Sequence, residues 1–155
     1  MTKTLLFLHL LSAFLFVSGA VVAGIAQLTA LRRERPSEIV LLFRVARSGA
    51  LLASVAAVAT LGFGLGLAGQ EDLDFGAGWI SGALALWLVS MILGGLGGRT
   101  ARRTRELAER LAAEGDRPAD ELRQLVAHRP SLLLSYASTA AVLAILVLMV
   151  WKPGG

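Results

Sequence analysis

Long uncharged runs alternate with charged segments along this chain. The runs without an acidic or basic residue are Thr4–Ala30, Ser48–Gln70, Phe75–Gly98 and Ser131–Trp151. A helix needs roughly 18–20 apolar residues to cross a hydrocarbon core of about 30 Å, and each run is at least that long. Four such runs leave too little polar surface to cover them in water. The pattern therefore predicts four membrane-spanning helices.

The fold class expected from these runs is all-α, a transmembrane four-helix bundle with short amphipathic helices on its cytoplasmic side. It would form a single integral membrane domain over residues 1–155. The expected spans lie at about residues 4–30, 48–69, 75–98 and 131–151. The first run exceeds the roughly 7–15 residues of a signal-peptide core and ends at an arginine cluster, so we expect it to remain uncleaved.

Residues 99–130, between the last two spans, form the largest polar segment. Its leucines recur at helical spacing, Gly115 is placed to end one amphipathic helix, and Asp116 with Pro118 can start another. We expect both helices to lie on the membrane surface, with leucines toward the acyl chains and basic residues toward anionic headgroups. A protein partner in the cytosol would use the same features.

Glycines recur within the spans at spacings that favour close helix packing. Gly62 and Gly66 form a Gly-x-x-x-Gly pair, which lets helix backbones approach each other in lipid. The tract from Gly94 to Gly98 lacks the Lys-Ser/Thr ending of a phosphate-binding loop, and we interpret it as a flexible or closely packed helix end. Faces of small residues suit a homo-oligomer as well as a monomer.

The distribution of charge indicates orientation and argues against nucleic acid as a partner. The chain is 55% hydrophobic and 17% charged, against about a quarter charged in soluble domains. Its net charge is +4, but every arginine lies within residues 32–47 or 99–129, and the connector 71–74 is acidic. By the positive-inside rule, both arginine-rich loops lie in the cytoplasm and both termini lie on the outer, periplasmic side.

His9 is a titratable group inside the first run. On a helical wheel Gln27 lies on the same side as His9, and Ser12 lies within about 60° of it. Bulky apolar residues occupy the opposite face: Leu11, Phe14, Leu15, Val21, Val22 and Ile25. We therefore expect His9, Ser12 and Gln27 to face the interior of the bundle.

Polar side chains also gather in the cytoplasmic half of the fourth span. Ser135, Tyr136 and Thr139 lie there, and we expect them to face the bundle as well. Hydroxyl groups in such a helix bond back to their own backbone or bridge to a neighbouring helix.

Chemistry at His9 has two interpretations. One is a neutral imidazole that hydrogen-bonds a neighbouring helix. The other is a haem or copper ligand, with Met149 or a carboxylate of the acidic connector 71–74 as its partner at the same depth. His128 lies toward the opposite membrane face, so a bis-histidine haem site within one chain is excluded. The chain has no cysteine, and it shows no catalytic triad and no cluster with metal-ligand spacing.

Three short stretches carry a resemblance to known proteins: Leu8-His9-Leu10-Leu11-Ser12-Ala13, Arg105-Glu106-Leu107-Ala108 and Leu148-Met149-Val150-Trp151-Lys152-Pro153. With the order of the spans, they make the chain resemble the DUF2269 family, which comprises bacterial predicted four-span integral membrane proteins of unknown function. The resemblance implies a multi-pass protein of the bacterial inner membrane. More distantly, the chain is similar to copper-resistance D-type and HemJ-type membrane proteins, and the HemJ similarity implies a haem-ligand role for His9.

Two functional hypotheses follow. The first is a non-enzymatic membrane protein that acts through packing, a partner or envelope maintenance, without a cofactor. The second is a haem- or metal-binding redox protein centred on His9. A transport role is a third possibility, but no charged residue lies in the middle of a span to couple an ion.

Overall fold

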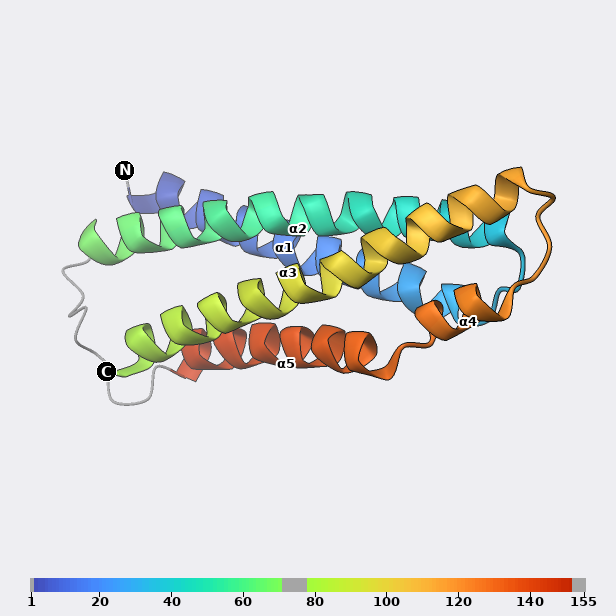
Figure 1. Ribbon diagram of the computed structural model, residues 1–155. Helices are drawn as coiled ribbons and strands as arrows, with labels where there is room; N and C mark the ends of the chain where they lie inside the picture. The colour runs from blue at the N-terminus through green and yellow to red at the C-terminus, as the bar shows by residue number, and fades with distance from the viewer. Residues whose placement is uncertain (1, 71–77, 152–155) are drawn as a thin grey trace.

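The computed structural model describes residues 2–70 and 78–151, which are almost entirely helical (Figure 1). The helices are α1 (Thr2–Ala30), α2 (Pro36–Gln70), α3 (Gly78–Ala113), α4 (Asp120–Val126) and α5 (Arg129–Trp151). By length and composition, α1, α2, α3 and the segment Asp120–Trp151, which contains α5, can each cross a membrane. The prediction of an all-α transmembrane bundle is confirmed.

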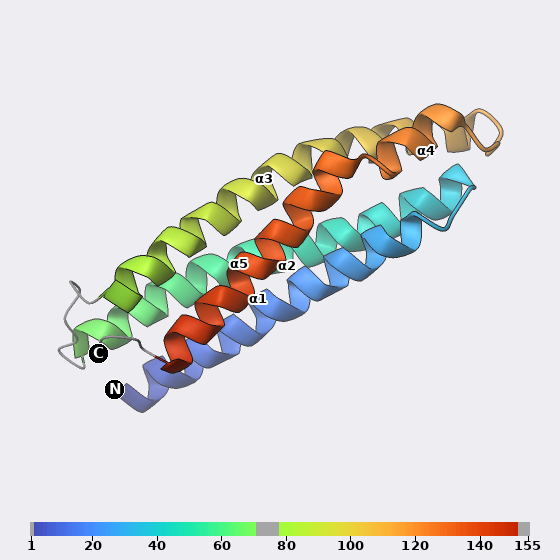
Figure 2. The same ribbon diagram turned by 90° about the horizontal axis from the view of Figure 1, so that it is seen from below.

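The bundle consists of two antiparallel hairpins. α1 packs mainly on α2, and α5 packs mainly on α3. Contacts between α2 and α3 join the two hairpins, whereas α1 and α5 touch each other only slightly. The start of α1 and the end of α5 lie at the same end of the bundle in both views (Figures 1 and 2). The arginine-rich segments lie at the opposite end, called here the arginine end.

The first hairpin is held by a close backbone crossing at Gly19 and Gly49. A Cβ atom built on Gly19 would lie 2.6 Å from the carbonyl oxygen of Gly49, and one built on Gly49 would lie 2.7 Å from the carbonyl oxygen of Gly19. Only glycine fits at both positions. The Gly62–Gly66 pair does not form this crossing, because Gly62 has open space beside it and Gly66 touches only the side chain of Leu5.

α3 continues far beyond its apolar run. Its 36 residues span about 54 Å at 1.5 Å per residue, well over a hydrocarbon core of about 30 Å. The glycine tract at residues 94–98 lies inside this helix, so its interpretation as a helix end was wrong. The first of the two expected amphipathic helices is likewise the second half of α3 and not a separate element.

An apolar cluster holds the arginine end together. Its buried members are Ala30, Ile39, Val40, Phe43, Ala108 and Leu122. Leu122 of α4 is only 1% exposed, and Leu107 and Leu111 of α3 pack against the same cluster. Of the leucines expected to enter the acyl boundary, Leu122 is therefore covered by protein and Leu107 and Leu111 are partly covered, because they pack on the apolar residues of α2.

The turn after α3 caps a helix that is distant in sequence. Gly115 and Asp116 have positive φ values, +125° and 55°, and they end α3 as the sequence predicts. Asp116 does not start α4, which begins at Asp120. Its carboxylate instead accepts hydrogen bonds of 2.7 Å from both the backbone N–H and the hydroxyl of Ser37, in the first turn of α2. These bonds lower the pKa of Asp116, and the charge of Arg35 adds to the effect.

Candidate functional site

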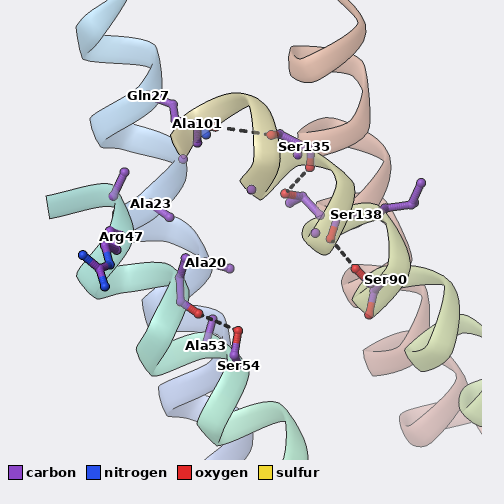
Figure 3. Close-up of a pocket in the computed structure, with 18 of the residues that line it drawn as sticks. Ala20, Ala23, Gln27, Arg47, Ala53, Ser54, Ser90, Ala101, Ser135 and Ser138 are labelled. Carbon is purple, nitrogen blue, oxygen red and sulfur yellow. Dashed lines mark hydrogen bonds between the residues drawn. The ribbon is translucent and has the colours of Figure 1, made fainter. Parts of the chain in front are cut away.

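A cavity of about 580 Å³ lies between the two hairpins. Every long helix contributes to its wall, as the close-up shows (Figure 3). Small residues leave the space: Ala20, Ala23, Gly24, Ala46, Ala50, Gly94, Gly97 and Gly98. The volume falls in the range of about 300–1,000 Å³ typical of small-molecule sites.

Two packed regions bound the cavity along the bundle. Toward the end of the bundle where α1 begins lies a second apolar cluster, in which Phe16, Ala53 and Val142 are members that also line the cavity. Toward the arginine end lies Phe43, which belongs to the first cluster. The cavity is therefore a gap between two well-packed layers and not the loose end of a bundle.

The hydroxyl groups that line the cavity already donate hydrogen bonds to the protein. Ser138 donates to the carbonyl of Ser90 at 3.2 Å, which links α5 to α3. Ser135 donates to the amide oxygen of Gln27 at 3.2 Å, so α5 and α1 face each other across the space (Figure 3). The hydroxyls of Ser54, Ser90 and Thr139 donate to carbonyls of their own helices.

Arg47, Arg102 and Arg105 line the cavity at the arginine end, and none of the acidic residues in the described ranges does. Arg102 Nε donates to Glu106 at 2.8 Å, and this pairing lowers the pKa of Glu106. The Arg105 side chain is 19% exposed, and its Nε lies 3.7 Å from a carboxylate oxygen of Glu109, beyond hydrogen-bonding range. Arg102 and Arg105 thus each have a carboxylate nearby, and Arg47 is the wall arginine that has no ion-pair partner among the described residues.

Some donors in the wall have no acceptor in the described part of the chain. Arg105 Nε is buried without a hydrogen-bond partner. Within residues 2–70 and 78–151, the Arg47 guanidinium has no ion-pair or hydrogen-bond partner, and neither has the amide nitrogen of Gln27. The unfilled hydrogen-bonding capacity of the cavity thus includes donors on α1, α2 and α3.

The residues expected to face the bundle are distributed over several environments. Gln27, Ser135 and Thr139 line the cavity. Ser12 is buried outside it and donates to the carbonyls of Leu8 and His9. The placement of Tyr136 was wrong, because its side chain is 57% exposed and takes no part in the cavity wall. It lies about 100° around α5 from Ser135, toward the outer surface.

His9 lies apart from the cavity and faces α2. Its Nδ1 is 3.0 Å from the carbonyl oxygen of Thr60. Since a carbonyl oxygen only accepts, Nδ1 is the donor in this bond, and in the tautomer protonated at Nδ1 the lone pair is on Nε2. A Cβ atom on Gly64 would lie 3.0 Å from the ring, so glycine makes the space in which the imidazole sits.

The structure gives no contact between His9 and the partners suggested for it within the described ranges. Met149 lies on α5, which packs mainly on α3 and only slightly on α1. The carboxylates of Glu71, Asp72 and Asp74 fall outside the described residues. Within residues 2–70 and 78–151, no group of three or more His, Asp or Glu side chains has metal-binding geometry.

The sequence pattern did not identify the arginines of the cavity as a set. Arg47 lies 55 residues before Arg102 and 58 before Arg105, and all three belong to segments interpreted as topology signals. Only Arg47 stands out locally, because it interrupts a stretch of apolar residues just before Ser48. The close approach of α2 to the second half of α3 brings them to one cavity.

Comparison with known proteins gives one match. A family model described as "Predicted integral membrane protein (DUF2269)" matches residues 3–153. No curated protein matches the chain. No solved structure matches it either.

Proposed function

This chain belongs to the DUF2269 family of predicted integral membrane proteins, and we propose that it is a non-enzymatic membrane protein that binds an amphiphilic small molecule between its two hairpins. The observation that supports this proposal is the cavity of about 580 Å³, which lies between two packed apolar clusters. Its wall is apolar where Phe16, Ala53 and Val142 meet and polar toward the arginine end, where Gln27, Ser135 and the three arginines line it. A molecule with a hydrocarbon part and a polar head matches that division.

Protection of an introduced cysteine tests this function, because the native chain has none. Thr139→Cys places a thiol on the cavity wall, and Ala140→Cys places one next to it outside the wall. Monoolein and oleate are the probes, added to the detergent-solubilised protein during labelling with a maleimide. We expect at least one of them to slow labelling of Thr139→Cys and to leave Ala140→Cys unchanged. Equal labelling with and without both probes would contradict binding in the cavity.

Filling the cavity gives an independent check. A Cβ atom on Gly94 or on Gly95 meets open space, but only Gly94 lines the cavity. In Gly94→Leu the added side chain occupies the site, so a bound amphiphile should no longer raise the unfolding temperature. Gly95→Leu, the matched control, should keep the wild-type shift.

We also propose that the protein resides in the bacterial inner membrane with its arginine end in the cytoplasm. The supporting observation is the confinement of arginine to residues 32–47 and 99–129. Reporter fusions would test the orientation. Activity of a cytoplasmic reporter fused within residues 71–74 would overturn it.

A haem- or metal-binding role at His9 is a second candidate function. The observation that favours it is the Nδ1–H bond to the Thr60 carbonyl, since ligating histidines usually fix their second nitrogen in this way. His9 would supply one ligand through Nε2, and Met149 or a carboxylate of residues 71–74 would have to supply the second. A visible spectrum after haem supplementation decides between the candidates: a Soret band that is absent in both His9→Ala and His9→Asn supports haem binding. Its absence from the wild-type protein contradicts it.

A further inference from the structure

The cavity has a polarity along the bundle that restricts the chemistry of its ligand. At one end its wall includes Phe16, Ala53 and Val142 from the second apolar cluster, beside Ser54 and Ser90, whose hydroxyls bond to their own helices. At the other end it includes Arg47, Arg102 and Arg105, and no acidic residue of the described ranges lines it, although Glu106 and Glu109 pair with two of these arginines from outside the wall. A single molecule that fills the cavity must therefore present hydrocarbon at one end and a group compatible with positive charge at the other.

The donors and acceptors that remain unpaired at the arginine end restrict the chemistry of the ligand's polar group. The serine and threonine hydroxyls of the wall already donate hydrogen bonds to oxygens of the protein, as the bonds from Ser138 and Thr139 to carbonyl oxygens illustrate. What remains unpaired in the described chain is a set of donors, on Arg47, Arg105 and Gln27. A group that only accepts hydrogen bonds complements this set, and an anionic oxygen does so most strongly.

Burial makes Arg105 the most informative of these donors. Its Nε is buried and unbonded, although Glu109 lies only 3.7 Å away. A buried donor without an acceptor is unfavourable by about 1–3 kcal/mol, and more when it is charged. The Nε atom itself is enclosed by protein, so a ligand oxygen would meet this guanidinium at its other nitrogens. A cationic or purely apolar ligand would give it no acceptor at all.

On the basis of the proposed function, we infer that the ligand is an anionic amphiphile, with a phosphate or carboxylate headgroup among Arg47, Arg102 and Arg105 and its hydrocarbon tail directed toward Phe16 and Val142. Arg47 supplies a guanidinium that has no partner among the described residues, and planar guanidinium groups bind such oxyanions with paired hydrogen bonds. Arg102 adds charge while it remains paired with Glu106.

The test uses four probes with one oleoyl-type chain and different headgroups: oleoyl lysophosphatidic acid, oleate, monoolein and oleylamine. Each protects Thr139→Cys from maleimide labelling in proportion to its occupancy. We expect the phosphate and carboxylate probes to protect at the lowest concentrations. Inorganic phosphate without a tail should protect poorly, and protection as strong as that by the lysophosphatidic acid would overturn the amphiphile in favour of a free anion.

Charge-matched variants locate the headgroup. Arg47→Gln and Arg105→Gln should each weaken binding of the phosphate probe by about tenfold or more, the usual effect of losing a hydrogen bond to a charged group. Arg103→Gln is the control, because Arg103 lies between the two α3 arginines of the site and takes no part in the wall. An equal loss in Arg103→Gln would mean that only general surface charge attracts the probe, and would overturn the site.

The outcomes separate this inference from the proposed function. If monoolein protects as well as the anionic probes, the cavity binds amphiphiles without charge selection, so the inference fails and the proposed function stands. If none of the four probes protects Thr139→Cys, the proposed function fails and the inference fails with it. Unfolding temperatures of the arginine variants without ligand check that each variant is folded.

Discussion

His9 and Gly64 form a complementary pair across α1 and α2. The imidazole reaches the Thr60 carbonyl because Gly64, one turn further along α2, leaves space for the ring. A polar side chain inside a membrane bundle usually bonds a neighbouring helix in this way. The bond explains the inward position of His9 without invoking a cofactor, and it leaves Nε2 available if one binds.

Substitutions of His9 test whether the hydrogen bond from its Nδ1 to Thr60 stabilises the fold. His9→Ala loses the bond to Thr60 and should lower the free energy of unfolding by about 1 kcal/mol. In His9→Asn the side-chain amide can still donate to the Thr60 carbonyl, so most of that stability should return. Reversible unfolding in mixed micelles measures both variants. Equal losses in the two variants would contradict a structural role for the Nδ1 bond.

Asp116 gives the arginine end a dependence on pH. Its pKa is lowered below the ordinary value of 3.8 by the bonds from Ser37. A carboxyl group whose pKa is lower in the folded state stabilises the fold above its ordinary pKa, and this contribution is lost as the pH falls through the lower folded value. We therefore expect the unfolding temperature of the wild type to decline in acid below about pH 4.

Asp116→Asn should show a weaker decline, because the substituted side chain has no proton to gain. Glu114→Gln, which removes the same charge two residues earlier, is the control and should retain the wild-type profile. Thermal unfolding between neutral and acidic pH measures all three proteins. Identical profiles for the wild type and Asp116→Asn would refute the contribution of this cap.

The first hairpin depends on its glycine crossing. Ordinarily Gly→Ala stabilises a helix interior by up to about 1 kcal/mol. At Gly19 the added methyl group would meet backbone atoms of Gly49 and Ala53 at 2.6 and 2.7 Å, and backbone cannot move aside as a flexible side chain can. We expect Gly19→Ala to destabilise the protein by about 1–3 kcal/mol, the usual cost of overpacking.

Gly24→Ala on the same helix is the matched control, because nothing lies within 4 Å of its added Cβ. It should be neutral or slightly stabilising. Unfolding of the two variants side by side measures the difference. A Gly19→Ala protein as stable as Gly24→Ala would show that α1 and α2 do not cross here.

The two hairpins are joined chiefly through α2 and α3. Trp87 of α3 donates from Nε1 to the Ala57 carbonyl of α2 at 3.2 Å, and Arg44 of α2 pairs with Glu109 of α3 at 3.6 Å. The Arg44–Glu109 pair is exposed and contributes little. The indole bond lies in the apolar middle of the bundle, so it is the more important of the two links.

Trp87→Phe keeps an aromatic ring and removes the donor to Ala57. We expect a loss of about 0.5–1.5 kcal/mol in stability and easier separation of the hairpins. Cysteines introduced at Gln27 and Ser135, which are hydrogen-bonded across the cavity, report that separation through their rate of disulfide cross-linking. Slower cross-linking in Trp87→Phe is the expected result, and an unchanged rate would contradict the role of this link.

The sequence alone determines the membrane location and much of the helix content of this protein, because the length and apolarity of a run are local properties. It also indicates the exposed face of α1, since Phe14 and Ile25 are 70% and 60% exposed, and the end of α3 at Gly115. These features require only the period of a helix and the conformational freedom of glycine.

The tertiary structure decides which of the many small and charged residues act together. Gly19 and Gly49 form the close crossing, although Gly62 and Gly66 have the more recognisable spacing. Asp116 caps α2 through Ser37, which lies 79 residues earlier in the chain. The arginines of α2 and α3 share a cavity because α3 continues past its apolar run and packs on α2. Such contacts depend on which helix faces meet in space, and no local pattern in the chain records that choice.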